Sequence, residues 1–108
     1  MKKLIIGLMF TISLNADFTD GNELQKWMNN TNKENGNRHS VGLFKGYISG
    51  VVDTGNNILF CTEDGVTRGQ YMAVVIKYIE NNPEKWNQGA SVIVLEALTK
   101  AFPCKNKK

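Results

Sequence analysis

The sequence predicts an all-α fold, a small four-helix domain with one disulfide. Four segments of the 108-residue chain carry apolar residues at the spacing of an amphipathic helix. Clusters of Gly, Asn and Pro separate these segments, as turns between helices do. Two cysteines form an even pair in a chain whose N-terminus is typical of an exported protein. The length fits a single domain.

The N-terminal segment has the pattern of a secretory signal peptide. A basic start at Lys2 and Lys3 is followed by an apolar run over residues 4–14 and by the small residue Ala16. The run has about half of the roughly 20 residues that span a bilayer, so a retained transmembrane helix is the weaker interpretation. We therefore expect a signal peptide over 1–16, cleaved after Ala16, and a helical domain over 17–108.

The charge of the remaining chain argues against a nucleic-acid partner. Without Lys2 and Lys3, 11 basic and 10 acidic side chains remain. A nearly neutral domain lacks the clustered Lys and Arg side chains that bind phosphates. We expect no nucleic-acid partner, and no membrane contact after cleavage.

The two cysteines, Cys61 and Cys104, are predicted to form a disulfide. An even pair in an exported chain is paired by default. The loop between them would add about 4 kcal/mol in the chain-entropy model. A zinc site or a catalytic thiol needs further ligands or a paired histidine, and the only histidine, His39, is distant in sequence. We expect no metal and no cofactor.

The first helix is predicted within residues 17–30. Leu24, Trp27 and Met28 follow the i, i+3, i+4 spacing of one helical face, after a polar start. The segment 29–40 is rich in Asn and poor in apolar residues, which predicts a loop.

A second helix is predicted over residues 41–53, with Thr54-Gly55-Asn56-Asn57 as its stop. Its apolar face comprises Val41, Phe44, Ile48, Val51 and Val52. Gly42, Gly46 and Gly50 recur at i, i+4, i+8, and each costs about 1 kcal/mol of helix propensity relative to alanine. We expect this stripe to let another helix of the same chain approach closely; contact with a partner chain is the alternative.

The third helix has the clearest start signal. Thr67 and Gln70 form a capping box, and Val66 with Tyr71 forms the matching hydrophobic staple. The predicted core face comprises Tyr71, Val74, Val75, Tyr78 and Ile79. The segment Asn81-Asn82-Pro83 ends the helix.

The fourth helix is predicted over residues 90–102, and Pro103 stops it. Its apolar face comprises Val94, Leu95, Leu98 and Phe102. A polar connection over 84–89 precedes it and carries one large apolar residue, Trp86.

Sequence patterns for catalysis are weak, so we expect no enzyme. The triplet Asp53-Thr54-Gly55 matches that of aspartic proteases, which need two carboxylates about 3 Å apart on an all-β scaffold. The helical context favours a helix end instead, with Gly55 as its left-handed stop. His39-Ser40 has no accompanying acid or oxyanion element. No phosphate-binding glycine loop or metal-ligand cluster is present in the sequence.

Several longer motifs, taken in order, identify a family. They are Gly21-Asn22-Glu23-Leu24, Gly46-Tyr47-Ile48-Ser49-Gly50-Val51-Val52-Asp53, Cys61-Thr62-Glu63-Asp64-Gly65-Val66-Thr67-Arg68-Gly69-Gln70 and Ala97-Leu98-Thr99-Lys100-Ala101-Phe102-Pro103-Cys104. Together they resemble the Rap/Tai family of type VI secretion immunity proteins, and the resemblance covers nearly the whole mature chain.

The resemblance implies a periplasmic, all-helical homodimer that neutralises a peptidoglycan amidase effector. In that family a surface element enters the groove of the amidase and covers its catalytic cysteine. Cys61 and Cys104 match the disulfide positions of the family. Many members have a further cysteine pair, at the places where this chain has Met28 and Phe44. An apolar contact between these two side chains would replace that bond.

The candidate contact surface consists of loops displayed by the helical scaffold. The residues predicted to bind the partner are Glu63, Asp64, Asn82, Glu84, Lys85, Trp86 and Gln88. For Trp86 an exposed anchor and a core staple are equally compatible with the sequence. A second hypothesis for the function is a periplasmic accessory or structural binding domain that shares the fold and meets no toxin.

Overall fold

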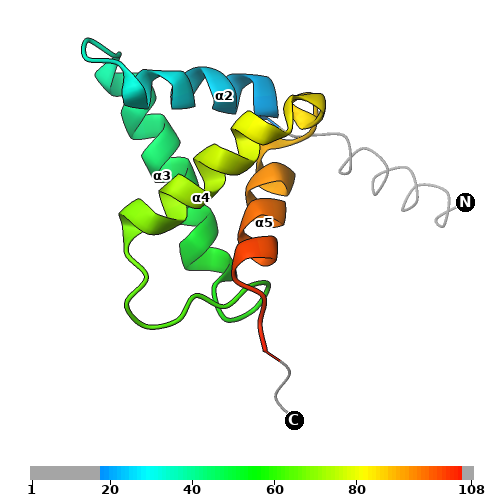
Figure 1. Cartoon of the computed structure of the whole chain (residues 1–108). Coiled ribbons are helices and arrows are strands. Elements are labelled where there is room, and N and C mark those ends of the chain that lie inside the picture. Colours follow the sequence, from blue (N-terminus) through cyan, green and yellow to red (C-terminus); the bar gives the residue numbers. More distant parts are fainter. Residues whose placement is uncertain (1–17, 106–108) are drawn as a thin grey trace, which may run out of the picture.

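The computed structural model describes residues 18–105, and this part of the chain is all-α. Its α-helices are α2 (Gly21–Asn29), α3 (Arg38–Gly55), α4 (Arg68–Asn81) and α5 (Ala90–Ala101). Short 3-10 helices follow α2 and α4: η1 (Asn30–Asn32) and η2 (Pro83–Lys85). In Figure 1, α2 lies across one end of the other three helices. The predicted four-helix, all-α fold is confirmed, while the predicted signal peptide over 1–16 lies outside the described residues.

Polar side chains determine where the first two helices begin. Asp20 caps α2, because its carboxylate accepts a hydrogen bond from the amide of Glu23 at 3.0 Å. Asn37 caps α3 by accepting from the amides of His39 and Ser40, at 2.8 and 3.3 Å. The predicted start of α3 at residue 41 is therefore wrong by three residues. Apolar periodicity marks where burial begins, whereas the cap marks where the helix begins.

The end of α3 also differs from the prediction. Gly55 is the last helical residue, and the left-handed conformation falls on Asn57, with φ of 69°. The structure requires glycine at position 55 for another reason. A Cβ there would lie 2.9 Å from Cε1 of Phe60, which packs against the helix end.

The capping box of α4 is confirmed in both directions. The amide of Gln70 donates to Oγ1 of Thr67 at 3.2 Å, and the amide of Thr67 donates to Oε1 of Gln70 at 2.8 Å. These bonds satisfy two amides at the start of α4, where no intrahelical partner exists.

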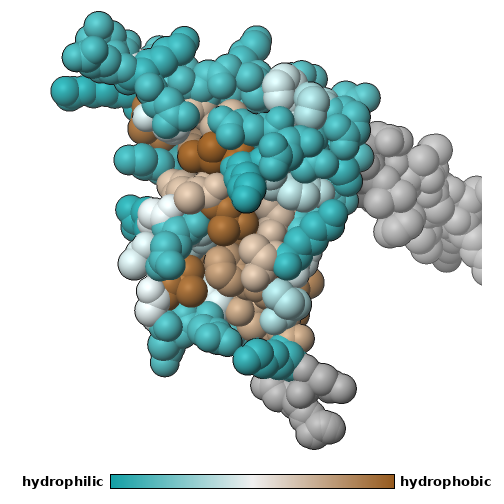
Figure 2. All heavy atoms as spheres, in the orientation of Figure 1, coloured by the Kyte–Doolittle hydropathy of each residue, from teal (hydrophilic) through white to brown (hydrophobic). Residues whose placement is uncertain are grey.

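A single hydrophobic core joins all four helices and the loop after α3. Its largest fully buried side chains are Phe44, Phe60, Leu24, Ile48, Ile79, Ile93, Leu98, Val75 and Val94. Met28 and Phe44, at the places of the second cysteine pair in the family, are both buried in this core. Figure 2 shows the face that α4 crosses, where apolar side chains gather between polar ones.

The buried faces of α4 and α5 are rotated from the predicted ones. On α4, Met72 is buried, whereas Tyr71 and Tyr78 are only partly buried at the edge of the core. On α5, Ile93 is fully buried, and Leu95 is partly buried. The tyrosines lie at the edge because their hydroxyl groups need polar partners, which the interior of this small core does not supply.

Within residues 18–105, the glycine stripe of α3 brings no other element into close contact, contrary to our expectation. A Cβ built at Gly42, Gly46 or Gly50 would meet no atom within 4 Å. Close approach of two elements occurs instead at Gly21 in α2. A Cβ there would lie 2.5 Å from Cδ1 of Ile93 and 2.6 Å from the carbonyl oxygen of Trp86.

The predicted disulfide between Cys61 and Cys104 is formed, with a Cα–Cα distance of 4.7 Å. Beside it, the amide of Cys61 donates to the carbonyl of Phe102 at 2.8 Å. The disulfide therefore fastens the loop after α3 to the chain that leaves α5.

Candidate partner-binding surface

Residues 82–89, which we call the α4–α5 connector, contain five of the seven residues predicted to bind a partner. The connector is fastened to the start of α2 by backbone hydrogen bonds. The amide of Gly21 donates to the carbonyl of Gln88 at 2.8 Å, and the amide of Ala90 donates to the carbonyl of Thr19 at 2.8 Å. These two bonds fix the C-terminal end of the connector to the segment that begins α2.

Trp86 anchors the connector to the core. Its indole is partly buried against the core, and Nε1 donates to the carbonyl of Ile79 at 2.9 Å. Of the two roles left open by the sequence, the structure thus gives Trp86 that of a core staple. The part of the ring that remains accessible adds an apolar area to the connector surface.

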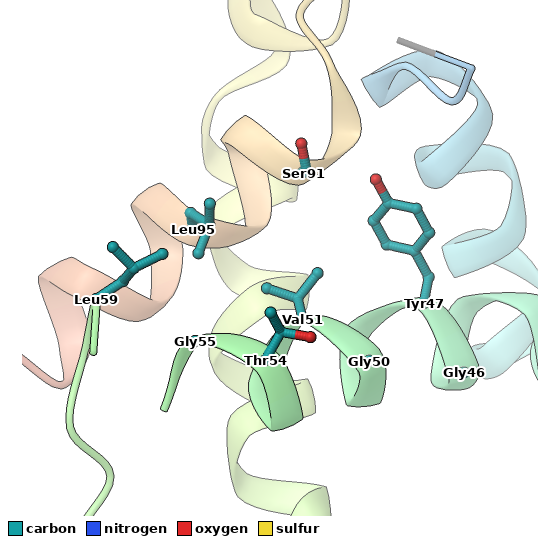
Figure 3. A pocket seen from close by; sticks show the side chains of 9 residues that line it. All are labelled: Gly46, Tyr47, Gly50, Val51, Thr54, Gly55, Leu59, Ser91 and Leu95. Atoms are coloured by element: carbon teal, nitrogen blue, oxygen red, sulfur yellow. The ribbon is translucent and has the colours of Figure 1, made fainter. Parts of the chain in front are cut away.

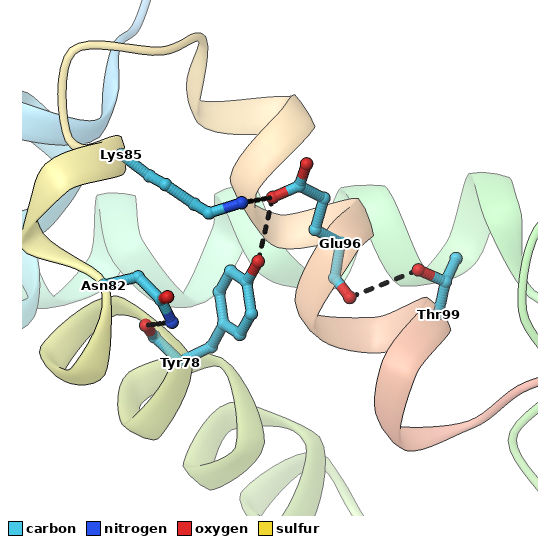
Figure 4. A network of polar contacts seen from close by, with 5 residues as sticks. All are labelled: Tyr78, Asn82, Lys85, Glu96 and Thr99. Carbon is cyan, nitrogen blue, oxygen red and sulfur yellow. Dashed lines mark hydrogen bonds and ion pairs between the residues drawn. The ribbon is translucent and has the colours of Figure 1, made fainter.

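Lys85 belongs to a polar network between the connector, α4 and α5 (Figure 4). Oε1 of Glu96 accepts from the hydroxyl of Tyr78 at 2.9 Å and from Nζ of Lys85 at 3.1 Å. Nζ of Lys100 lies 5.3 Å from the centre of the Tyr78 ring, and Nζ of Lys85 lies 5.9 Å from it. The Tyr78 ring therefore has two cations near it, one from the connector and one from α5.

This network shifts the pKa values of its charged members in opposite directions. The hydrogen bond from Tyr78, followed by that from Lys85, lowers the pKa of the Glu96 carboxyl below its ordinary value of 4.5. The hydrogen bond to Glu96 raises the pKa of Lys85 above 10.5. Both shifts favour the charged forms at neutral pH. The connector consequently carries a fixed positive charge next to α5.

The remaining connector residues divide between structural and exposed positions. Asn82 ends α4, and its Nδ2 donates to the carbonyl of Tyr78 at 2.8 Å. Glu84 and Gln88 have exposed side chains. Of the predicted residues, Glu84, Gln88 and the accessible parts of Lys85 and Trp86 are therefore open to a partner, and Pro83 and Asn87 of the connector are exposed as well.

Glu63 and Asp64, the other two predicted binding residues, lie at the opposite end of α4. Both are exposed in the loop that precedes this helix, and Glu63 pairs with Lys105 at 3.4 Å. An ion pair this exposed to solvent contributes little to stability. The 14 residues of α4 put about 21 Å between the loop and the connector. The structure does not bring the two groups into one patch.

An apolar groove between α3 and α5 was not predicted from the sequence. It has a volume of about 490 Å³. Its walls are formed by Gly46, Tyr47, Gly50, Val51, Thr54, Gly55, Leu59, Ser91 and Leu95. Figure 3 shows α3 and α5 on either side of it, with Leu59 near one end. The signal in the sequence was the apolar run Ile58-Leu59-Phe60 after the end of α3, in which Ile58 and Leu59 are 74% and 54% exposed.

The aspartic-protease triplet Asp53-Thr54-Gly55 lies in a helix, not on the all-β scaffold that such a protease needs. Asp53 is an exposed residue of α3 in an all-α fold, so the protease triplet is part of a helix end. Over residues 18–105, no three or more His, Cys, Asp or Glu side chains come together in a way that would hold a metal ion. Within the same range, every helix is too short or too polar to cross a membrane.

The comparisons with known proteins identify the family. Residues 20–104 match the family model of Rap1a immunity proteins. The matched range includes α2 through α5, both cysteines and the whole connector. The search of curated proteins gave no match. Because the family match covers most of the sequence, it confirms the resemblance to the Rap/Tai immunity proteins. The chain therefore belongs to the Rap1a immunity protein family.

Proposed function

We propose that this protein is a periplasmic immunity protein that binds and inhibits a peptidoglycan amidase effector of a type VI secretion system. Membership of the Rap1a family indicates an immunity protein for a secreted effector. The proposal adds the compartment, the secretion system and the class of effector. The single observation that carries it is the family match over residues 20–104.

The disulfide supports the proposed compartment. Disulfides persist in oxidising environments such as the periplasm and are rare in the bacterial cytosol. The bond between Cys61 and Cys104 closes a loop that includes α4, the connector and α5. Its formation therefore fits a protein that works outside the inner membrane, where a peptidoglycan amidase acts.

The α4–α5 connector is the surface that we assign to amidase binding. Trp86 fixes its middle to the core, and the contacts of Gln88 and Lys85 fix it to α2 and α5. A segment that is already ordered loses little conformational entropy when it binds. Such a segment is suited to entering the groove of an enzyme and blocking it. The protein acts in this proposal by binding alone, without a cofactor.

We further propose that the protein is a homodimer. The resemblance to the Rap/Tai immunity proteins implies this state. The Glu63-Asp64 loop and the connector lie at opposite ends of α4, so one copy presents them on separate surfaces. A dimer gives each amidase molecule access to surfaces from two copies.

Expression in the periplasm together with the amidase tests the proposal. Cells that produce a cysteine amidase encoded beside this chain are expected to lyse, and production of this protein is expected to prevent lysis. Equal lysis with and without the protein, together with no complex on purification, contradicts the proposal. A protein that protects no cell and binds no toxin would be an accessory domain of the same fold.

Charge reversal on the connector tests the assigned surface. Glu84→Lys changes an exposed side chain that makes no hydrogen bond or ion pair within residues 18–105. We expect it to weaken the amidase complex and leave the unfolding midpoint unchanged. Glu34→Lys, in the loop before α3, is the matched control and is expected to bind normally. Equal affinity of the two variants would remove the connector from the binding surface.

A further inference from the structure

A second groove lies between α4 and α5, beside the connector, and has a volume of about 370 Å³. We call it the lysine groove; its lining includes Val74, Lys77, Asn82, Ala97, Lys100 and Ala101. We propose that it receives an acidic segment of the amidase effector, in which a carboxylate stands beside an apolar side chain. This inference rests on the proposed function and names the chemistry of a further contact with the same partner.

The charged side chains that line the groove are both cationic. Lys77 comes from α4 and Lys100 from α5, so each helix contributes one charge. Both lysines are exposed, and neither takes part in an ion pair within residues 18–105. An anion is attracted to both cations at once, and a carboxylate is the anion that the side chains of a protein partner supply.

The neighbouring carboxylates of the chain leave the two lysines unpaired. Oε1 of Glu96 already accepts from Nζ of Lys85 at 3.1 Å and from the hydroxyl of Tyr78 at 2.9 Å (Figure 4). Lys100 acts on Glu96 through space, without forming an ion pair with it. Glu80 of α4 does not line the groove. The positive charge of the groove therefore suits an acidic group from another molecule.

Lys100 is already positioned beside the groove. Its Nζ lies 5.3 Å from the centre of the Tyr78 ring, and Tyr78 also lines the groove. The hydrogen bond to Glu96 fixes this ring, and the attraction between cation and ring favours one position of the ammonium group. A charged group that is positioned before binding loses less conformational entropy when a partner arrives.

Three small apolar residues define the other part of the ligand. Val74 is partly buried, Ala97 is buried and Ala101 is exposed, and all three line the groove. An apolar side chain of the partner is removed from water when it packs against them. A bare anion gains nothing from this part of the lining. The matching ligand is therefore a peptide segment with both a carboxylate and an apolar side chain.

The groove and the connector form one continuous surface, because Asn82 belongs to both. Nδ2 of Asn82 donates to the carbonyl of Tyr78 at 2.8 Å, which ties the end of α4 to the start of the connector. A partner seated on the connector therefore lies next to the groove. This continuity is why we assign the groove to the effector and not to a separate protein.

Neutralising the two lysines tests the inference by calorimetric titration of the disulfide-bonded mature chain with the amidase. We expect Lys77→Gln/Lys100→Gln to raise the dissociation constant about tenfold or more, equivalent to 1.4 kcal/mol. Lys26→Gln/Lys45→Gln is the matched control and should leave it unchanged. It removes the same charge from exposed lysines outside the groove, and Lys26, like Lys100, lies in the last turn of its helix. Equal effects of the two double variants would overturn the inference.

Salt dependence and groove filling test the two parts of the ligand separately. Added sodium chloride should weaken the natural complex more than that of Lys77→Gln/Lys100→Gln, because salt screens charge pairs. Ala101→Leu narrows the groove and should weaken binding. Ala73→Leu changes another exposed alanine, outside the groove, and should not. Circular dichroism checks that all variants fold. An equal salt dependence of the two complexes, or equal affinity of the two leucine variants, would contradict the inference.

A peptide probe separates this inference from the proposed function. Acetyl-Leu-Glu-amide should shift the amide resonances of Val74 and Ala101 in nuclear magnetic resonance spectra, and acetyl-Leu-Gln-amide should shift them less. Equal shifts from both peptides would overturn the inference. Binding of the acidic peptide at the groove without any binding of the amidase contradicts the amidase proposal alone.

The remaining outcomes concern the occupant of the groove. Amidase binding that is unchanged in Lys77→Gln/Lys100→Gln contradicts this inference and leaves the proposed function standing. A change of oligomeric state in this variant, measured by sedimentation equilibrium and without loss of amidase affinity, would assign the groove to a second copy of the chain. That result would also overturn the inference.

Discussion

The indole of Trp86 donates a hydrogen bond from Nε1 to the main-chain carbonyl of Ile79, at 2.9 Å. This bond joins the α4–α5 connector to the last turn of α4. Trp86 therefore stabilises the connector by fastening it to α4 and to the hydrophobic core. The conformation of the proposed binding surface depends on it.

Trp86→Phe is expected to lower the free energy of unfolding by about 1 kcal/mol, because the ring packing is largely kept and the hydrogen bond is lost. Urea denaturation followed by circular dichroism measures the change. Trp27→Phe is the control, since Trp27 is also partly buried and makes a ring contact with Tyr47 at 6.2 Å. Equal effects of the two substitutions would show that the Trp86 hydrogen bond contributes nothing measurable.

Removal of the disulfide is expected to destabilise the protein strongly. In the chain-entropy model, the 43-residue separation of Cys61 and Cys104 corresponds to about 4 kcal/mol. Cys61→Ser/Cys104→Ser should lower the urea midpoint accordingly. Dithiothreitol should lower the midpoint of the natural protein and leave that of the double variant unchanged. Two free thiols in the unfolded, unreduced protein would contradict the pairing.

Gly21→Ala is expected to cost about 1–3 kcal/mol, which is typical of overpacking. The added methyl group would lie 2.6 Å from the carbonyl oxygen of Trp86, and backbone cannot move aside as a flexible side chain can. Gly69→Ala, where the nearest atom is 3.8 Å away, should not destabilise the protein. Thermal unfolding of both variants tests the difference. A Gly21→Ala protein as stable as the natural one would refute the close packing of α2 on the connector.

The network of Glu96 predicts how stability depends on pH. The pKa of Glu96 is lowered by folding, so its contribution is present above 4.5 and is lost as the pH falls through the folded value. The pKa of Lys85 is raised, so its contribution is present below 10.5 and is lost as the pH rises through the folded value. Glu96→Gln should therefore be less stable than the natural protein at neutral pH.

The difference between the two proteins should shrink as the pH falls below 4.5. Unfolding midpoints measured at neutral pH and through the acid range test this. Tyr78→Phe, which removes one hydrogen bond to the carboxylate and keeps the carboxylate itself, should show an intermediate acid dependence. An equal loss of stability in acid for the natural protein and Glu96→Gln would contradict a lowered pKa of Glu96.

Local signals in the sequence predicted the helices and the covalent link. The Thr67–Gln70 box marked the start of α4, because both of its bonds lie within one turn of helix. The start of α3 was missed because Asn37 caps it from a polar segment without apolar periodicity. The disulfide could be predicted from the number of cysteines and from the expected export, without knowledge of the packing.

Features that depend on contacts between several helices could not be predicted from local sequence signals. The spacing of Gly42, Gly46 and Gly50 suits close approach of another backbone, but only the tertiary structure shows whether another element approaches them. The burial of Met72 in place of Tyr71 likewise depends on how α4 is rotated against its neighbours. The role of Trp86 required the position of the Ile79 carbonyl, which lies seven residues earlier.

Titration of the amidase with the purified protein tests the central claim most directly. The rate of peptidoglycan cleavage is followed while the disulfide-bonded protein is added. The proposed function predicts that cleavage stops at a fixed molar ratio and that Glu84→Lys shifts the titration to higher concentrations, whereas Glu34→Lys does not. An unchanged cleavage rate at a large excess of the natural protein would contradict the claim that it inhibits this effector.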